Sequence, residues 1–339
     1  MPSVLGMIGD NGIVRLNQYL SGVTTIMIEC LNLSKKFGQF TAVDDLSFTA
    51  NKGQVLGFLG PNGAGKSTTM KMITGFLEPT SGQVKVCGID IADDPISVKS
   101  KIGYLPEGAP SYGEMEVGQF LHFVAPLRGI KSTLVKSAVE SVISRVNLEK
   151  VYFQKIETLS KGFKRRVGLA QAIIHDPEVL VMDEPTDGLD PNQKHQVREL
   201  ITDMSKDKTI ILSTHILEEV HAVCDRAIII AGGKIVADNT PSEMEGMSRY
   251  HHAVSFVSDL DTELLNKIKN MDCVRDVTYD SRLKETTIFP TQGLFIFDEI
   301  SEFLRKQSIQ VKSLKMEAGR LDEVFRNITH SVGEREVVK

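Results

Sequence analysis

The sequence predicts an α/β fold followed by a smaller α+β domain, and three observations support this prediction. A glycine-rich loop at residues 60–68 lies between an apolar run at 55–59 and a helical stretch that begins near Met70. Short apolar runs then alternate with helical segments up to about residue 245, a pattern typical of a sheet covered by helices on both faces. After residue 250 the pattern changes to short strands separated by helices.

The expected strands of the first domain fall into two groups. Two strands, at residues 28–33 and 46–49, belong to a small antiparallel region. The core strands are continuous apolar runs at residues 55–59, 102–105, 179–182, 210–213 and 227–230. Residues 115–175 are helical in character, with amphipathic helices predicted at 134–146 and 164–174.

The C-terminal part has the element order of a ferredoxin-like α+β domain. Its predicted elements follow the order β-α-β-β-α-β, at residues 253–257, 262–268, 274–279, 286–289, 295–304 and 310–314. Residues 320–328 would add a closing helix. We therefore divide the chain into a first domain at 27–247, a C-terminal domain at 248–330 and a tail at 331–339. Dimer support is the role we favour for the C-terminal domain, with regulation and substrate sensing as alternatives.

The first 26 residues do not resemble a secretory signal peptide, because they include Asp10 and Arg15 and contain no long apolar core. A strand pattern begins at Met27. We expect either that Met27 is the natural start or that residues 1–26 are a loosely ordered extension, with an additional amphipathic helix as a further alternative.

Composition narrows the function classes. The 339 residues are 41% hydrophobic and 24% charged, an ordinary composition for a soluble protein of about two domains. The net charge of −5 argues against nucleic acid as the main partner, because binding phosphate backbones needs a basic surface. No apolar run approaches the ~20 residues of a membrane helix, so work at a membrane would need a second subunit. The four cysteines lack metal-ligand spacing and are expected as free thiols: Cys30, Cys87, Cys224 and Cys273.

The glycine-rich loop matches G-x-x-x-x-G-K-[ST], a phosphate-binding motif, through Gly60, Pro61, Asn62, Gly63, Ala64, Gly65, Lys66, Ser67 and Thr68. Its glycines let backbone N–H groups turn inward around phosphates, and the following helix N-terminus adds favourable partial positive charge. Lys66 would reach the β- and γ-phosphates, and Ser67 would ligate Mg²⁺. A plain turn between strand and helix is the alternative, which the full match disfavours.

Two carboxylates end the predicted strand at 179–182. Asp183 would hold the Mg²⁺ shell, and Glu184 would polarise the attacking water. Solvated acids at a strand end are the alternative, which the loop at Lys66 disfavours. His215 follows the strand at 210–213, where a contact to the γ-phosphate is expected.

These motifs, in this order, resemble the ATP-binding cassette (ABC) ATPases over residues 27 to about 245. By that resemblance, residues 60–68 are the Walker A loop and residues 179–184 the Walker B strand. The run Leu159-Ser160-Lys161-Gly162-Phe163 resembles the family signature, Leu189-Asp190 the D-loop and His215 the switch histidine. The family implies a phosphate-loop domain with a mixed sheet core, an antiparallel β subdomain and a helical subdomain.

The resemblance also implies the reaction, ATP + H₂O to ADP + phosphate coupled to transmembrane transport, with ATP and Mg²⁺ as cofactors. A head-to-tail homodimer would sandwich the nucleotide between Lys66, Asp183, Glu184 and His215 of one copy and Ser160 and Gly162 of the other. By the same resemblance, Asp190 of the D-loop is expected to contact the nucleotide. Phe37 lies where the family stacks an aromatic ring on adenine, and a core phenylalanine is the alternative for it.

Two motifs depart from the family pattern, at three positions. The signature usually has glycine and glutamine where this chain has Lys161 and Phe163. Lys161 would either add a cation near the partner's nucleotide or point to solvent. Glu107 stands where the family usually has glutamine; it keeps an oxygen ligand for the metal and loses an amide donor. Hydrolysis is expected to survive, because Lys66 and the two carboxylates are intact.

The run at residues 103–110 resembles a bacterial ABC-2-type exporter branch of gliding-motility and multidrug-type ATP-binding proteins, and so does the ending at 321–325. That branch implies a peripheral subunit on the cytoplasmic face of the inner (plasma) membrane, bound to a separate polytopic permease. Residues 108–130 would meet this permease. The groove candidates are Phe120, Phe123 and Leu127, with core packing as the alternative for each.

Two other classes stay open. Some cassette ATPases act on ribosomes or DNA, although the ribosomal type normally joins two cassettes and the DNA-repair type carries a long coiled-coil insertion. A nucleotide-gated structural protein that hardly hydrolyses ATP is disfavoured by Glu184 and His215. The transported substrate is not readable, because its pathway would lie in the other subunit.

Overall fold

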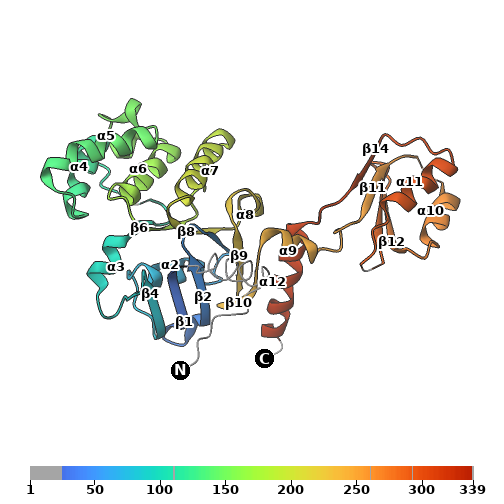
Figure 1. Ribbon diagram of the computed structural model, residues 1–339, viewed down its shortest axis with the longest axis horizontal. Coiled ribbons are helices and arrows are strands. Elements are labelled where there is room, and N and C mark those ends of the chain that lie inside the picture. The colour runs from blue at the N-terminus through green and yellow to red at the C-terminus, as the bar shows by residue number, and fades with distance from the viewer. Residues whose placement is uncertain (1–24, 110, 260, 292, 338–339) are drawn as a thin grey trace, which may run out of the picture.

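Six strands form the central sheet of the protein, in the order β10-β9-β3-β8-β7-β6 (Figure 1). The computed structural model describes residues 25–337 except 110, 260 and 292, so the extension discussed above lies almost wholly outside the described residues. The strands are β3 (Val55–Leu59), β6 (Ile102–Leu105), β7 (Val179–Asp183), β8 (Thr209–Thr214), β9 (Arg226–Ala231) and β10 (Lys234–Asn239). All pair in parallel except β10, which is antiparallel to β9.

The parallel pairing brings the candidate site residues to one edge of this sheet. Every residue of β3, β7 and β8 is buried, as expected for strands covered on both faces. Because the carboxyl ends of parallel strands meet at the same edge, the loops that leave β3, β6, β7 and β8 lie together there. These loops carry the glycine-rich motif, Glu107, Glu184 and His215.

A second, antiparallel sheet packs beside the first in the order β2-β1-β4-β5. Its strands are β1 (Ile26–Phe37), β2 (Phe40–Asn51), β4 (Ser81–Val86) and β5 (Ile89–Asp90). Helix α2 (Lys66–Ile73) lies in the same hydrophobic cluster as both sheets, with Met70, Met72 and Ile73 fully buried. The phosphate loop is therefore held between two sheets, and not only by the strand that precedes it.

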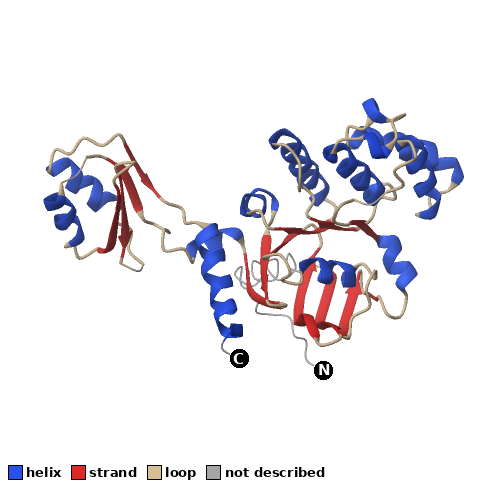
Figure 2. Ribbon diagram, turned by 180° about the vertical axis from the view of Figure 1, so that it is seen from behind, coloured by secondary structure: helices blue, strands red, loops and turns tan. Residues whose placement is uncertain are grey.

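Helices form a separate lobe above the central sheet (Figure 2). The helices of the first domain are α3 (Pro95–Lys101), α4 (Val117–Leu127), α5 (Val135–Arg145), α6 (Lys161–Ile173), α7 (Pro191–Ser205), α8 (Leu217–Val223) and α9 (Pro241–Gly246). Helix α6 packs tightly on the loop after β6, because a Cβ on Gly168 would lie 2.7 Å from the Cβ of Ala109. The connections between α4, α5 and α6 contain short 3₁₀ helices at Ser132–Leu134, Glu149–Val151 and Ile156–Thr158.

The C-terminal sheet stands apart from the first domain, with α10 and α11 on one face (Figures 1 and 2). Its elements are β11 (Val254–Val257), α10 (Thr262–Lys269), β12 (Val274–Asp280), β13 (Glu285–Pro290), α11 (Phe297–Lys306) and β14 (Ser313–Met316). The strand order β12-β13-β11-β14 is antiparallel throughout. The structure thus has the predicted β-α-β-β-α-β order, with its own core around Phe256 and Ile288.

The last helix, α12 (Leu321–Val337), returns to the first domain. Leu321 belongs to that domain's hydrophobic core, and Phe325 packs against it. Glu323 Oε2 accepts hydrogen bonds from Ser248 Oγ at 2.5 Å and from the Arg249 N–H at 3.1 Å. By packing, this helix therefore belongs with the first domain, whereas the sequence division placed its first half in the C-terminal domain.

Two antiparallel segments connect the C-terminal sheet to the rest. The His252 N–H donates to the Glu317 carbonyl at 3.1 Å, and the Glu317 N–H donates to the Ala253 carbonyl at 2.7 Å. The guanidinium of Arg320 lies 3.7 Å from the ring centroid of Tyr250. Among the helices described, none has the length and apolarity needed to cross a bilayer.

Candidate nucleotide site

The loop after β3 is built around glycines that cannot be replaced freely. Gly63 and Gly65 have φ angles of 81° and 108°, in the left-handed region that favours glycine. A Cβ on Gly65 would lie 2.6 Å from the Ala42 carbonyl oxygen of the neighbouring β2 strand. The loop then enters α2 directly at Lys66, so the first N–H groups of the helix face the loop.

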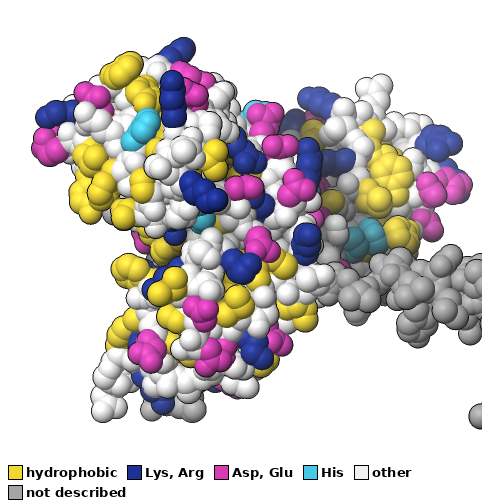
Figure 3. Space-filling model, turned by 60° about the vertical axis from the view of Figure 1, so that its left-hand side comes forward, with side chains coloured by type: hydrophobic (Ala, Val, Ile, Leu, Met, Phe, Trp, Pro, Cys, Tyr) yellow, Lys and Arg dark blue, Asp and Glu magenta, His cyan; other side chains and the backbone are white. Residues whose placement is uncertain are grey.

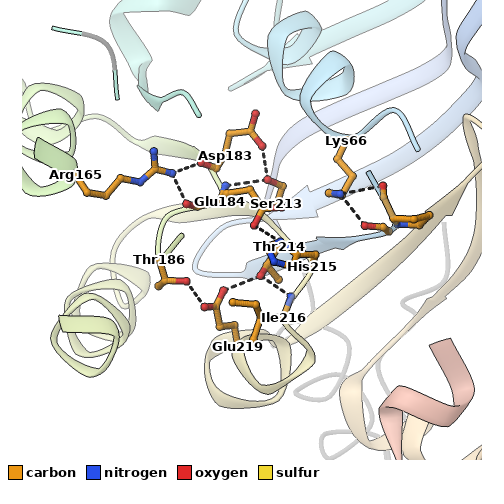
Figure 4. Close-up of polar contacts among 12 residues, drawn as sticks. Lys66, Arg165, Asp183, Glu184, Thr186, Ser213, Thr214, His215, Ile216 and Glu219 are labelled. Carbon is orange, nitrogen blue, oxygen red and sulfur yellow. Dashed lines mark hydrogen bonds and ion pairs between the residues drawn. The ribbon is translucent and has the colours of Figure 1, made fainter. Parts of the chain in front are cut away.

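Lys66 occupies the centre of this loop. Its ammonium donates hydrogen bonds to the carbonyls of Gly60 at 2.7 Å and Pro61 at 3.2 Å, and its side chain is buried (Figure 4). Burial lowers the pKa of Lys66, while the carboxylates of Glu184, Asp183 and Glu107 act in the opposite direction. A buried cation whose partners among the described residues are two carbonyls is well suited to receive an anionic phosphate.

Asp183 lies at the end of β7, almost fully buried. Its Oδ1 accepts a hydrogen bond from the Ser213 hydroxyl of β8 (Figure 4). Its Oδ2 is buried without a hydrogen-bond partner among the described residues. An unsatisfied buried carboxylate oxygen is costly, so this atom calls for a cation or an ordered water beside it.

Glu184 has an unusual backbone conformation. Its φ is 51°, which is rare for a residue with a side chain, and its N–H is held by both the hydroxyl and the carbonyl of Ser213, at 3.0 and 3.2 Å. The His215 Nδ1 lies 2.9 Å from Glu184 Oε2. Burial raises the pKa of the Glu184 carboxyl, and His215 and Lys66 oppose that rise.

A cavity of about 280 Å³ unites the central part of this set. Its lining residues are Asn62, Gly63, Ala64, Gly65, Lys66, Ser67, Glu107 and Glu184. The sequence motifs at Lys66, Glu107 and Glu184 come from three separate loops, and the structure brings them to one cavity. A phosphate chain along the loop would therefore meet a cation, a hydroxyl and two carboxylates together.

Comparison with known proteins identifies the family. The profile of the family described as "ABC transporter" matches residues 43–187. The linearmycin resistance ATP-binding protein LnrL of Bacillus subtilis is 32% identical over 305 residues, which cover 89% of this chain and 98% of LnrL. The chain belongs to the ABC transporter family. It is therefore an ATP-binding cassette that binds and hydrolyses ATP.

Two further matches agree with this assignment. The Nod factor export ATP-binding protein I of Rhizobium etli is 36% identical over 218 residues, 64% of this chain and 69% of that protein. A solved structure described as an ATP-binding subunit of an ABC transporter has a TM-score of 0.60 and 29% identity, and the match covers 65% of this chain and 92% of that one. The predicted α/β cassette fold is confirmed.

The residues that resemble the family signature and D-loop are not among those that line the cavity. Ser160 caps α6, where its hydroxyl accepts from the Phe163 N–H at 3.4 Å. Asp190 caps α7 and accepts from the Gln193 N–H at 2.9 Å. Gly162 is covered by the Gln193 side chain, which occupies the place a Cβ would take. One copy of the cassette therefore does not bring these residues to its own phosphate loop.

The aromatic candidate Phe37 lies at the tip of the β1–β2 hairpin. It pairs in register with Phe40 across a two-residue turn, and the two side chains are 50% and 62% exposed. Because Ala42 of the same hairpin touches the loop at Gly65, both rings are candidates for an adenine contact, and core packing is excluded for Phe37. Sequence reasoning missed Phe40, although its spacing from Phe37 on a hairpin was the available signal.

Other residues of the cassette site were also missed. The buried carboxylate of Glu219 accepts hydrogen bonds from the hydroxyls of Thr186 and Thr214, the latter at 2.7 Å, and so links the segment after Glu184 to the His215 loop (Figure 4). Arg165 of α6 lies behind Glu184. Neither had a sequence signal, because each stands beside another charged residue on its helix.

The donor set fits a magnesium ion held jointly with nucleotide phosphates. Asp183 Oδ2 is an oxygen without a partner among the described residues, and Ser67 and Glu107 line the adjacent cavity. The described residues contain no cluster of three or more His, Cys, Asp or Glu side chains able to form an all-protein metal cage. Mg²⁺ characteristically takes one or two protein ligands plus phosphates and water, which matches this arrangement.

Proposed function

We propose that the chain is the ATP-hydrolysing subunit of a bacterial ABC-2-type exporter whose transmembrane permease is a separate polypeptide. The observation that carries this proposal is the cavity that brings Lys66, Glu107 and Glu184 together in a chain of this family. The names of two relatives, one for resistance and one for export, support the direction of transport. The subunit would sit peripherally at the cytoplasmic face of the inner membrane.

Hydrolysis would proceed by in-line attack of a water on the γ-phosphate. Glu184 would accept the proton of this water, and His215 at 2.9 Å would orient the carboxylate. Lys66 would exchange its two carbonyl partners for phosphate oxygens and stabilise the charge that develops on them. When bound through Ser67, Asp183 and Glu107, Mg²⁺ would neutralise further phosphate charge.

A second copy of the chain would complete the nucleotide-binding site. Ser160 is exposed at the N-terminus of α6 and lies outside the cavity of its own copy, so it is available to another, whereas the Gln193 side chain covers Gly162 and would have to move aside. A helix N-terminus attracts phosphate oxygens through its free N–H groups and dipole. A head-to-tail homodimer would place this end of α6, together with Asp190, opposite the phosphate loop of the partner.

The permease would dock in a groove beside the Glu107 loop. This groove, about 640 Å³, has an apolar floor and a basic rim, and its lining includes Lys99, Tyr112, Phe120, Phe123, Leu127 and Arg128. Tyr112 packs edge-on against the rings of Phe120 and Phe123, at centroid distances of 6.3 and 5.8 Å. Figure 3 shows hydrophobic side chains gathered on the helical lobe of this face.

The exposure of these side chains shows which of them could contact the permease and which are packed in the core of the helical lobe. Phe123 and Leu127 are 45% and 70% exposed, whereas Phe120 is 2% exposed and supports the groove from beneath. The groove therefore suits a short permease helix with an apolar face. Because Lys99 and Arg128 line the groove, we expect that helix to carry an acidic residue toward them.

A pull-down of tagged Glu184→Gln from detergent-solubilised membranes tests the proposal. The substitution should lower the ATPase rate about 100-fold or more and retain ATP binding, so that partners are held in the ATP-bound state. Recovery of a polytopic membrane protein supports the exporter subunit. Recovery of ribosomal or DNA-bound proteins instead would move the assignment to a non-transport cassette.

Surface variants then test the groove. Leu127→Glu and Phe123→Glu should abolish recovery of the membrane protein while leaving ATP hydrolysis by the isolated subunit intact. Leu283→Glu is the matched control, because Leu283 is 63% exposed and lies on the C-terminal domain, away from the groove. Equal recovery with all three variants would reject this docking site.

A further inference from the structure

Arg165 is a buried guanidinium that the mechanism above does not use. It lies in the N-terminal half of α6, is 7% exposed, and donates hydrogen bonds to backbone carbonyls of two loops (Figure 4). Its Nε donates to Pro185 at 3.2 Å, its Nη1 donates to Pro106 at 3.0 Å, and its Nη2 donates to the carbonyls of both Asp183 and Glu184. Three chain segments, α6 and the exits of β6 and β7, thus meet at one side chain.

The backbone that follows β7 needs a hydrogen-bond donor such as Arg165. Glu184 adopts a φ of 51°, a strained conformation that persists only where neighbours hold it. Ser213 holds the N–H side of Glu184 through two hydrogen bonds. Arg165 holds the carbonyl side of the same residue, and it also bonds the carbonyls before and after it.

The chemistry of the guanidinium explains why arginine stands here. Its fork of donors can serve several carbonyls at once, whereas the compact ammonium of lysine can reach fewer of them. Burial lowers the pKa of Arg165, and the carboxylates of Asp183, Asp187, Glu184 and Glu107 oppose this effect. Burying a cation is expensive unless its donors are satisfied. The four carbonyl partners satisfy these donors, so the buried guanidinium is stable in this position.

Arg165 also connects this backbone to the signature helix. Ser160, the N-cap of α6, precedes it on the same helix, and Gly168 further along is pressed against Ala109 of the Glu107 loop. The helix that would reach the partner's nucleotide is thus tied to the residue that would activate water.

We propose that Arg165 is a positioning residue that fixes the backbone of Glu184 and of the Glu107 loop relative to α6, so that the Glu184 carboxylate points at the γ-phosphate. This inference rests on the proposed role of Glu184 as the base. Arg165 itself touches carbonyl oxygens and acts through Glu184.

The test compares kcat and KM for ATP hydrolysis in Arg165→Met, Arg165→Lys and the parent. Displacing a catalytic group by about 1 Å costs on the order of 100-fold. We therefore expect Arg165→Met to lower kcat about 100-fold with KM changed less than about threefold, and Arg165→Lys to recover part of the loss. Arg166→Met is the matched control on the same helix, because its guanidinium bonds the Val146 carbonyl and the Gln196 side chain instead. That variant should keep kcat near the parental value.

A double variant separates positioning from general structural damage. In the Glu184→Gln background, Arg165→Met should cause little further loss of kcat, because residues that act as a unit are non-additive. Fully additive losses, or a raised KM with an unchanged kcat, would overturn the proposal. If Glu184→Gln alone hydrolyses ATP like the parent, the assigned base is wrong and the proposal on Arg165 falls with it. If Arg165→Met does not fold, Arg165→Gln gives the same comparison, since its amide can still donate to one carbonyl.

Discussion

Single glycines of the phosphate loop differ in what they tolerate. Gly65 combines a φ of 108° with the close approach of the Ala42 carbonyl, whereas Gly63, with a φ of 81°, has open space where a Cβ would lie. At both positions the positive φ angle disfavours any residue with a side chain. Only at Gly65 would the added Cβ also clash with a backbone atom, the Ala42 carbonyl oxygen. The two are a natural pair for separating conformational strain from steric exclusion.

Gly65→Ala should therefore destabilise the protein by about 2 kcal/mol more than Gly63→Ala does. Each variant pays the strain of a positive φ, and Gly65→Ala must also displace β2 from the loop. Thermal unfolding of the two variants beside the parent measures this difference. Equal shifts in Tm would show that the contact with Ala42 relaxes without cost.

His175 gives a pH dependence of stability. Its Nε2 lies 3.2 Å from the Ile102 carbonyl, and burial lowers the pKa of His175 to about 4, helped by the cations of Arg128 and Lys208 and opposed by Asp176. In the unfolded chain a histidine titrates near pH 6.5. As the pH falls from about 6.5 towards 4, the unfolded state gains a proton that the folded state does not, so stability is lost in that window.

His175→Gln should remove this component, which amounts to about 3 kcal/mol at the acid end. The measurement is the urea midpoint of parent and variant at several pH values between 7 and 4. The variant should lose less stability than the parent across that range. Parallel curves would show that His175 does not carry the acid sensitivity.

How well single residues could be predicted depended on the range of their contacts. Lys66, Glu107 and Glu184 stand in local motifs, and the structure places all three at the cavity. Arg165 was not predicted because its partners lie 18 to 59 positions away and are backbone carbonyls, which leave no mark on the sequence. The Lys- and Arg-rich helix gave no sign of which cation turns inward.

At the scale of elements, apolar core strands were predicted within a residue or two, whereas the antiparallel strands were predicted too short. Strand β1 runs from Ile26 to Phe37 and pairs with β2 through several register shifts. Each bulge breaks the two-residue alternation on which the prediction depends. Strand β10 lies at the edge of the sheet, is exposed at Lys234 and half-buried beyond it, and had only the short apolar run 235–237 to predict it.

The β1–β2 hairpin yields a prediction for nucleotide affinity. An exposed ring that stacks on a base contributes about 1–3 kcal/mol, so Phe37→Ala should weaken ATP binding about tenfold or more. Phe40→Ala tests the other candidate ring, on the opposite strand of the same turn. Calorimetric titration with ATP and with inorganic triphosphate separates base from phosphate contacts. Loss of triphosphate affinity in Phe37→Ala would contradict stacking, and a larger effect in Phe40→Ala would transfer the role to that ring.

At the scale of the whole molecule, the C-terminal sheet is an insertion between two segments that both belong to the first domain. The row Thr278, Thr287, Ser255 and Lys315, in register across the sheet, is polar, and its two central residues, Thr287 and Ser255, are buried with their hydroxyls 3.1 Å apart. A face with this row is unsuited to a large apolar interface, so dimer support from this domain would come through a strand edge and be modest.

Removing the insertion tests that role without damaging the cassette. Deleting residues 250–339 would also remove α12 and its buried Leu321, so loss of folding would be uninformative. Because Ala253 and Glu317 are hydrogen-bonded neighbours, residues 254–316 can instead be replaced by a hairpin turn of about two to five residues.

This variant should fold, bind ATP and retain basal hydrolysis, because the phosphate loop, both carboxylates and α12 remain. If the domain supports the dimer, ATP-dependent dimerisation in the Glu184→Gln background should weaken about tenfold, measured by analytical ultracentrifugation over a concentration series. An unchanged dimer constant rejects dimer support and favours a regulatory or sensing role. A weakened dimer with intact ATP binding shows that the separate sheet stabilises the assembly and that the first domain binds the nucleotide without it.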